Sequence, residues 1–189
     1  MSRIESSWIS RENLDCIRNN INENIYNWLV LSNNLTESIK KTGADFKLNL
    51  LSQSVGKPYS DEALVFNKSN VDASTALVRR VFLEGNNRPM IFARVIVPES
   101  TYLNYRSEFT NLGSKPIGNT LLYNDEKVSR RDFEYNVIDS NSSVFHELKG
   151  LNQILNEDHF WARRSVFDFP KGPILISEVF LKDIPLYPY

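Results

Sequence analysis

The stretch from Thr75 to Pro98 limits the folds open to this chain more than any other part of the sequence. Two runs rich in β-branched and aromatic residues flank a Gly-Asn-Asn segment at residues 85–87. That composition is typical of an antiparallel β-hairpin closed by a turn whose residues accept a positive φ. We therefore expect a long hairpin at the centre of the fold.

The predicted hairpin carries arginines where apolar side chains dominate. Because side chains alternate between the two faces of a strand, Arg79 falls on one face of the first strand and Arg80 on the other. On the second strand, Arg94 shares a face with Phe92 and Ile96. A strand with one solvated face normally gathers its charges on that face. These guanidinium groups therefore require partners, either within the protein or in a ligand.

Length and composition favour a single domain that spans residues 1–189. The 22 basic and 23 acidic residues leave a net charge of -1, which argues against a nucleic-acid partner and favours a small molecule. Cys16 is the only cysteine, so an intrachain disulfide is excluded. No apolar run reaches the roughly 18 residues of a membrane span, and the N-terminus lacks the pattern of a signal peptide. We expect a soluble, unexported protein.

The first 43 residues have a helical pattern. Apolar residues between Ile17 and Leu31 recur every three or four positions, which predicts an amphipathic helix. Asn34, with Glu37 three positions later, resembles the capped start of a second helix that ends at Gly43. The pair could be a DNA-binding helix-turn-helix, but its charges do not form a basic recognition face. We favour two packed helices.

Six later runs have the composition and alternation of strands, and turns or irregular loops separate most of them. They are residues 45–51, 75–83, 90–97, 133–137, 165–169 and 174–181. The polar segment 60–74 has no period and is expected to be a loop. Residues 140–159 are expected to contain a helix, with helical spacing at Val144, Leu148, Leu151 and Leu155. This order favours an α+β fold with a single antiparallel β-sheet and helices on one side.

Familiar catalytic motifs are missing from the sequence. No glycine-rich segment precedes a Lys-Ser or Lys-Thr pair, so there is no phosphate-binding P-loop. His146 and His159 lack the spacing and companions of metal ligands, and we expect no metal site. Cys16 is expected to be a small packed side chain rather than a nucleophile. The charges on the strands remain as candidates.

Glu178 is the acidic counterpart of the arginines, on a strand face shared with Ile176 and Phe180. It could form a structural ion pair with Arg79 or Arg94, or lie at an exposed sheet edge. Alternatively, these charges line a cavity. There a guanidinium would bind a ligand carboxylate, and a carboxylate with a raised pKa would exchange a proton. This alternative implies a small, anionic and partly ring-like ligand.

Five segments, in this order, resemble the chorismate lyase (chorismate pyruvate-lyase) family: LVRRVFL, FARVIVP, LGSKPIGNTL, WARRS and LISEVFL. The resemblance runs from near Trp28 to the C-terminus, and it is nearest to members from cyanobacteria and red-algal plastids. It implies a single antiparallel sheet with helical-hairpin flaps over an internal ligand site. It also implies cleavage of chorismate to 4-hydroxybenzoate and pyruvate without metal or cofactor, which would supply a quinone head group.

The resemblance also implies roles for particular residues. Arg79 matches the family arginine that binds the ring carboxylate, and Glu178 matches the glutamate at the ring hydroxyl, so both are expected to be catalytic. Arg94 matches an arginine expected to bind the enolpyruvyl carboxylate. Leu35 and Ile117 match positions that close the pocket and present backbone amides.

Other features distinguish this chain from the family pattern or have two interpretations. Arg163 and Arg164 could support the site, but we favour their solvation at a strand end. Residues 140–159 replace a short connection in bacterial members, and Arg80 stands where an acidic residue is common.

A second function remains open, because the same fold resembles the effector-binding domain of a class of bacterial transcription regulators. Such regulators carry a separate winged DNA-binding domain, for which 189 residues leave no room. We therefore favour an enzyme over a sensor. We expect it to be a monomer, in the cytoplasm or in the plastid stroma if it is plastid-encoded.

Overall fold

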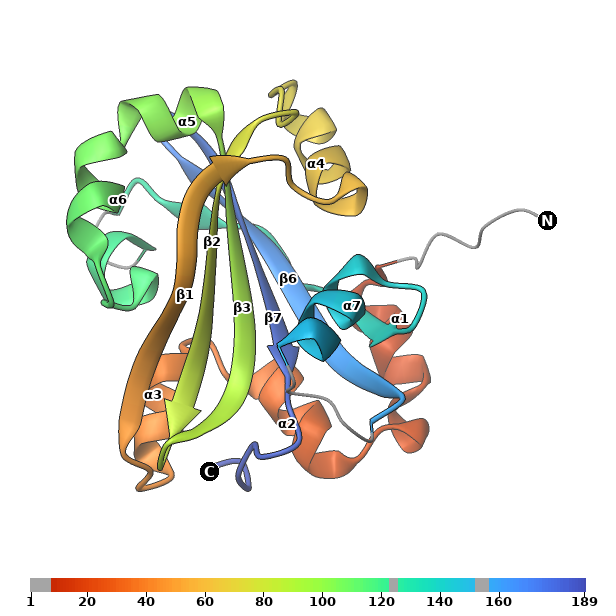
Figure 1. The fold of residues 1–189 in the computed structure, drawn as a ribbon. Helices are drawn as coiled ribbons and strands as arrows, with labels where there is room; N and C mark the ends of the chain where they lie inside the picture. The colour runs from red at the N-terminus through yellow and green to blue at the C-terminus, as the bar shows by residue number, and fades with distance from the viewer. Residues whose placement is uncertain (1–7, 123–125, 152–156) are drawn as a thin grey trace.

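The computed structural model describes residues 8–122, 126–151 and 157–189, and within them one antiparallel sheet organises the chain (Figure 1). The strand order is β1-β2-β3-β7-β6-β4. The remaining strand, β5, also pairs with β6. The strands are β1 Phe46–Gly56, β2 Ala76–Gly85, β3 Arg88–Pro98, β4 Ser129–Arg130, β5 Glu134–Asp139, β6 His159–Phe169 and β7 Gly172–Phe180. The predicted α+β fold with a single antiparallel sheet is confirmed.

Short helices cover the sheet. They are α1 Arg11–Cys16, η1 Arg18–Asn20, α2 Glu23–Leu31, α3 Leu35–Lys41, α4 Ser60–Val65, η2 Phe66–Ser69, α5 Glu99–Asn104, α6 Arg106–Leu112, η3 Gly118–Leu122 and α7 Ser143–Gly150. The segments α2–α3 and α5–α6 lie toward opposite ends of the strands (Figure 1). Each is a pair of consecutive helices of the kind expected to close over a site.

The central hairpin forms as predicted. Asn86 and Asn87 have φ values of 54° and 60°, and Gly85 pairs with Arg88 across the turn. Two consecutive central residues with positive φ are the requirement of a type I′ turn, which matches the twist of the flanking strands. Asparagine tolerates this conformation better than most residues with a side chain. The hairpin strands β2 and β3 then occupy the middle of the sheet.

The predicted helix over residues 17–31 is wrong in its first half. α1 ends at Cys16, and a new helix starts after Asn22, whose side chain accepts hydrogen bonds from the N–H groups of Asn24 and Ile25. This local cap competes with a continuous helix, although the apolar spacing persists across it. As a result Ile17 and Cys16 are exposed, and the expectation of a packed Cys16 is also wrong.

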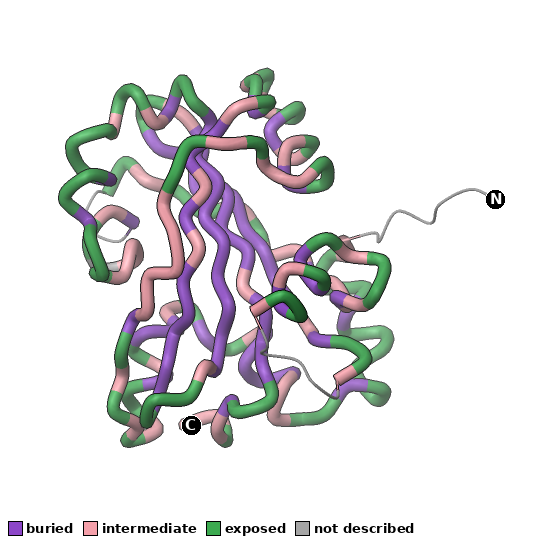
Figure 2. Tube along the Cα trace, viewed as in Figure 1, coloured by how far each residue is buried: buried purple, intermediate pink, exposed green. Residues whose placement is uncertain are grey.

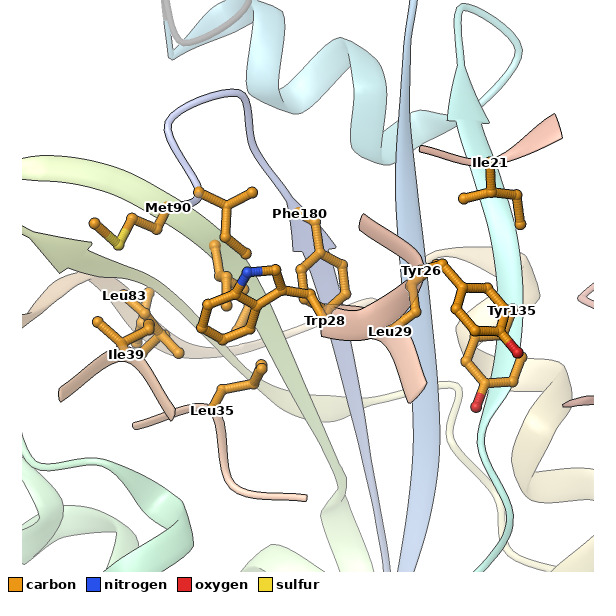
Figure 3. Packing of buried hydrophobic residues seen from close by; sticks show 14 of the residues in the cluster. Ile21, Tyr26, Trp28, Leu29, Leu35, Ile39, Leu83, Met90, Tyr135 and Phe180 are labelled. Carbon is orange, nitrogen blue, oxygen red and sulfur yellow. The ribbon is translucent and has the colours of Figure 1, made fainter. Parts of the chain in front are cut away.

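The second predicted helix is confirmed at both ends. The Asn34 side chain accepts a hydrogen bond from the N–H of Glu37, and Gly43 follows the helix with a φ of 80°. α2 and α3 pack together against the sheet rather than presenting a recognition face. In Figure 3, Trp28 lies beside Phe180, with Leu35 close by.

The segment 60–74 is helical at its start, contrary to the expected loop. The Glu62 carboxylate accepts a hydrogen bond from the Tyr59 N–H at 2.9 Å, which satisfies one free donor at the start of α4. α4 has only six residues, too few to display an apolar period. The charge on Glu62 is nevertheless buried, with 2% of the residue exposed, which the polar sequence of this segment does not indicate.

Helices cover both faces of the sheet, so the expected one-sided arrangement is wrong. Figure 2 shows the central strands buried along most of their length. On one face, α2 and α3 pack against side chains that include Leu83 and Phe180. On the other face, Phe82, Phe92 and Val179 pack against α7. The predicted helix in residues 140–159 is therefore present as α7, although Leu155 lies outside the described residues.

A buried charge network holds α4 and α7 on this second face. Arg94 forms a bidentate pair with Glu62, at 2.7 Å and 3.0 Å, and donates to Glu147 of α7 at 2.6 Å. Glu147 also accepts from Arg80 at 2.7 Å and from the Tyr59 hydroxyl at 2.9 Å. Burial, together with the nearby Glu147 charge, raises the pKa of Tyr59 to about 12. Arg80 and Arg94 are thus balanced by Glu62 and Glu147.

Replacing Glu147 tests how much this network stabilises the fold. Glu147→Gln keeps the shape of the side chain but leaves Arg80 and Arg94 short of one counter-charge in a buried setting. We expect the free energy of unfolding to fall by about 3 kcal/mol, as for other broken buried pairs. Urea denaturation measures it. The control Glu37→Gln removes a half-exposed pair with Lys40 and should cost under about 0.5 kcal/mol. Equal losses in the two variants would contradict the prediction.

Candidate functional site

A cavity of about 690 Å³, counted out to its solvent-open mouth, lies between the sheet and the helical segments. The sheet contributes side chains from β1, β2, β3, β4, β6 and β7, and residues 33–36 and 116–118 form part of the opposite wall. The charged lining residues are Arg79, Arg130, Arg163 and Glu178. Among the described lining residues, three guanidinium groups and one carboxylate give the cavity a net positive charge, which favours an anionic ligand.

Arg79 lies in this cavity as a buried cation, with 1% of the residue exposed. Its guanidinium donates to the Gln53 side-chain oxygen at 2.8 Å and to the Lys115 carbonyl at 3.0 Å. In the part of the chain that the structure describes, no carboxylate pairs with it. Burial lowers the pKa of Arg79 to about 10, so the group still carries its charge at neutral pH. A buried charge without a counter-ion is costly, and an anionic ligand would offset that cost.

Gln53 is a site residue that the sequence analysis missed. Its amide nitrogen donates to the Phe109 carbonyl at 2.9 Å, while its oxygen holds Arg79, so it joins β1, Arg79 and α6. The predicted strand ended before Gln53. A bulge between Leu50 and Ser52 also shifts the alternation, so that Gln53 pairs with Arg79. Simple period-two counting from Leu50 would have placed Ser52 on the cavity face instead.

Glu178 also lies at the cavity wall, but its partner is neither of the arginines expected from the sequence. Its Oε2 atom accepts a hydrogen bond from Nε of Arg163 at 2.6 Å. The two residues are direct neighbours across β6 and β7. Arg79 and Arg94 lie on other strands and form no ion pair with Glu178. The pairing with Arg79 or Arg94 that the sequence left open is therefore replaced by a pairing with Arg163 at the cavity wall.

Arg163 is buried, with 1% of the residue exposed, and does not solvate a strand end. The strand β6 starts at His159 rather than at the predicted Ser165, so Arg163 lies well inside it. Arg164 points to the opposite face, where it is also largely buried and donates to Glu134 at 2.8 Å. The favoured interpretation of both arginines as solvated groups is wrong, because the strand extends further toward the N-terminus than its apolar alternation indicates.

Arg94 does not belong to this cavity. Its neighbours Ala93 and Val95 line the cavity, so Arg94 projects from the other face of β3, into the network with Glu62 and Glu147. The two carboxylates satisfy the charge that was expected to meet a ligand. The assignment of Arg94 to a ligand came from the resemblance, and faces of different strands can be matched only when the pairing register is known.

Leu35 and Ile117 line the cavity, as expected, from the start of α3 and from the segment before η3. Arg130, which also lines the cavity, is another residue that the sequence analysis missed. Its guanidinium donates to the Asn33 side-chain oxygen at 3.0 Å and lies 4.3 Å from the centre of the Phe133 ring. Arg130 belongs to the two-residue strand β4, too short to produce a recognisable pattern.

The two histidines do not line this cavity. His146 on α7 and His159 at the start of β6 are exposed. Among the described residues, no three or more His, Cys, Asp or Glu side chains gather as potential metal ligands. No helix in these ranges is long and apolar enough to cross a membrane.

Solved structures share this architecture at low sequence identity. The crystal structure of the PhnF C-terminal domain gives a TM-score of 0.55 at 10% identity and covers 77% of this chain and 88% of that one. The effector domain of PhnF from Mycobacterium smegmatis gives 0.51 at 12% identity, covering 79% of this chain and 89% of that one. At these identities the similarity shows the fold alone.

Sequence relatives point to one family. A probable chorismate pyruvate-lyase of Pseudoalteromonas atlantica is 31% identical over 170 residues, which cover 88% of this chain and 83% of the relative. Another, from Psychromonas ingrahamii, is 32% identical over 167 residues, covering 87% and 86%. Both are bacterial, and they give no support to the expected closeness to plastid proteins. The chorismate lyase sequence model matches residues 5–188. The chain therefore belongs to the chorismate lyase family.

Proposed function

We propose that this protein cleaves chorismate to 4-hydroxybenzoate and pyruvate in the cavity that holds Arg79 and Glu178. The observation that carries the proposal is the buried Arg79 guanidinium, which has hydrogen-bond acceptors but no counter-charge among the described residues. A substrate carboxylate would supply that charge. Family membership and the names of the curated relatives support the same reaction.

The ring carboxylate is assigned to Arg79. Gln53 and the Lys115 carbonyl already fix the plane of the guanidinium, so little side-chain freedom is lost when the ligand binds. A charge-assisted hydrogen bond in a desolvated cavity is stronger than one in water. Leu35 at the start of α3 and Ile117 just before η3 would close over the ring.

Chorismate has a second carboxylate, on its enolpyruvyl group. Arg94 faces the opposite side of the sheet and is already paired, so it is a poor candidate for this group. Of the arginines that line the cavity, Arg163 holds Glu178, and Arg130 has no ion pair within the described ranges. We therefore assign the enolpyruvyl carboxylate to Arg130.

The reaction requires loss of the proton at C4 of the ring and departure of enolpyruvate from C3. The electrons of the broken C–H bond enter the ring, which becomes aromatic as the C3–O bond breaks. The C4 proton reaches the departing enolpyruvate, directly or by way of Glu178, and pyruvate forms. We place Glu178 at the ring hydroxyl. Its carboxylate would accept a hydrogen bond from that hydroxyl and balance the charge that develops at C4. Positioning of the substrate contributes further to the rate enhancement.

The product would serve as a quinone head group. We propose a monomer as the functional unit. We propose the cytoplasm as the setting, or the plastid stroma for a plastid-encoded copy.

Replacing Arg79 tests the carboxylate site. Arg79→Met keeps much of the side-chain volume but removes the charge, and 4-hydroxybenzoate should bind about 30-fold to several thousand-fold more weakly. Titration calorimetry measures this affinity. The control Arg80→Met changes the next residue, whose side chain lies on the opposite face, and should leave the affinity unchanged. Unchanged affinity in Arg79→Met would remove Arg79 from the site.

The Arg130 assignment is tested by comparing substrate with product. 4-Hydroxybenzoate lacks the enolpyruvyl carboxylate, so Arg130→Met should raise KM for chorismate about tenfold or more while changing product affinity less than about threefold. Steady-state kinetics and calorimetry on one preparation give both values. Equal losses for substrate and product would show that Arg130 does not distinguish them.

Glu178→Gln separates an enzyme from a binding module. The amide keeps the shape and can still hydrogen bond, but it cannot take up a proton or balance developing charge. We expect kcat to fall by roughly 10² to 10⁴ while 4-hydroxybenzoate affinity changes less than about tenfold. A large loss of stability with unaltered kcat would show a purely structural role. No turnover by the parent protein would instead favour a small-carboxylate sensor.

A further inference from the structure

Arg163 joins two parts of the cavity wall through one guanidinium group. Its Nε atom donates to Oε2 of Glu178 at 2.6 Å. Its Nη1 atom donates to the carbonyls of Leu29 at 2.9 Å and Ser32 at 2.6 Å. The Arg163 side chain is almost completely buried, and so are its contacts with the two carbonyls, whereas Glu178 is partly exposed to the cavity.

The carbonyls that Arg163 contacts belong to the end of α2. The last carbonyls of a helix have no partner within the helix and carry its partial negative charge. A cation there satisfies both requirements. The chain then continues into residues 33–36, which line the cavity. Arg163 therefore anchors the first helical segment at the point where it meets the site.

The same contacts fix the carboxylate of Glu178. Because Arg163 occupies Oε2, the other oxygen, Oε1, is left without a hydrogen bond from any described residue. Glu178 lines the cavity, so this oxygen is the one available to a ligand. The plane of the guanidinium is itself restricted, since it lies 4.2 Å from the centre of the Phe133 ring.

We propose that Arg163 is a positioning residue that orients Glu178 for the reaction, using the end of α2 as a fixed anchor. This inference rests on the proposed function. Arg163 acts through Glu178 and does not touch the substrate. A lysine would keep the charge but not the planar fork, so it could hold either the carboxylate or the helix carbonyls, but not both in the same geometry.

A double-mutant cycle between Arg163 and Glu178 tests the proposal. Arg163→Lys alone should lower kcat by about 10-fold to 100-fold, with a smaller change in KM, because Glu178 is misdirected. In a Glu178→Gln background the same substitution should lower kcat less than about threefold, since little is left to orient. If the lysine variant does not fold, Arg163→Gln, which retains one set of donors, replaces it in the cycle.

Arg164→Lys is the matched control. Arg164 is the adjacent residue of β6, is also largely buried, and pairs with Glu134 on the opposite face of the sheet. Its substitution should lower the melting temperature by an amount similar to that of Arg163→Lys but leave kcat unchanged. A kcat loss of equal size in the control would show that general damage to β6 explains the result and would overturn the proposal.

The outcomes distinguish this inference from the proposed function. Independent, multiplicative effects of the two substitutions on kcat, in an active parent, would overturn the role of Arg163 and leave the lyase assignment standing. If the parent binds 4-hydroxybenzoate but does not turn over chorismate, the lyase assignment fails. The cycle is then read in 4-hydroxybenzoate affinity, where non-additive effects support the orientation of Glu178 and additive effects overturn it. A parent without turnover or binding would overturn both.

Discussion

The burial of the Arg79 charge is the constraint on which the site depends. Removing a guanidinium from water without a carboxylate partner is unfavourable, and the hydrogen bonds to Gln53 and the Lys115 carbonyl offset only part of that penalty. These bonds also require the segment before η3 to stay over the sheet. The same arrangement that places a positive charge in the cavity therefore helps to cover the cavity. A bound carboxylate would complete the charge balance.

The two faces of the sheet treat their arginines differently. On one face, Arg80 and Arg94 meet Glu62 and Glu147, and the result is a balanced network that ties α4 and α7 to the strands. On the other face, the arginines donate mainly to backbone carbonyls and to a single carboxylate, Glu178. Carbonyls orient a guanidinium without neutralising it. The first face is thus suited to stability and the second to binding an anion.

The fold by itself does not determine the function. The PhnF effector domain has a similar architecture at 12% identity, which shows that very different sequences can form this arrangement of strands and helices. The case for an enzyme depends instead on particular side chains. Among the described residues, Arg79 meets no counter-charge and one oxygen of Glu178 accepts no hydrogen bond. Residues 140–159, the segment expected from the resemblance to differ from bacterial members, contribute Glu147 to the opposite face. Their helix therefore supports the sheet without entering the cavity.

The sequence alone determined the features that depend on local chemistry. The Asn86-Asn87 turn, the Asn34 cap and the strand alternation follow from the conformations of neighbouring residues, and together they specify an antiparallel sheet with packed helices. The resemblance to the family placed Arg79, Glu178, Leu35 and Ile117 in one cavity, and the structure brings them together.

Tertiary structure alone decided which charges pair. The partner of Glu178 follows from the register of β6 against β7, the position of Gln53 from a bulge in β1, and the separation of Arg94 from Arg79 from the pairing of β2 with β3. Period-two alternation gives the faces within one strand, but only the register between strands relates one set of faces to another.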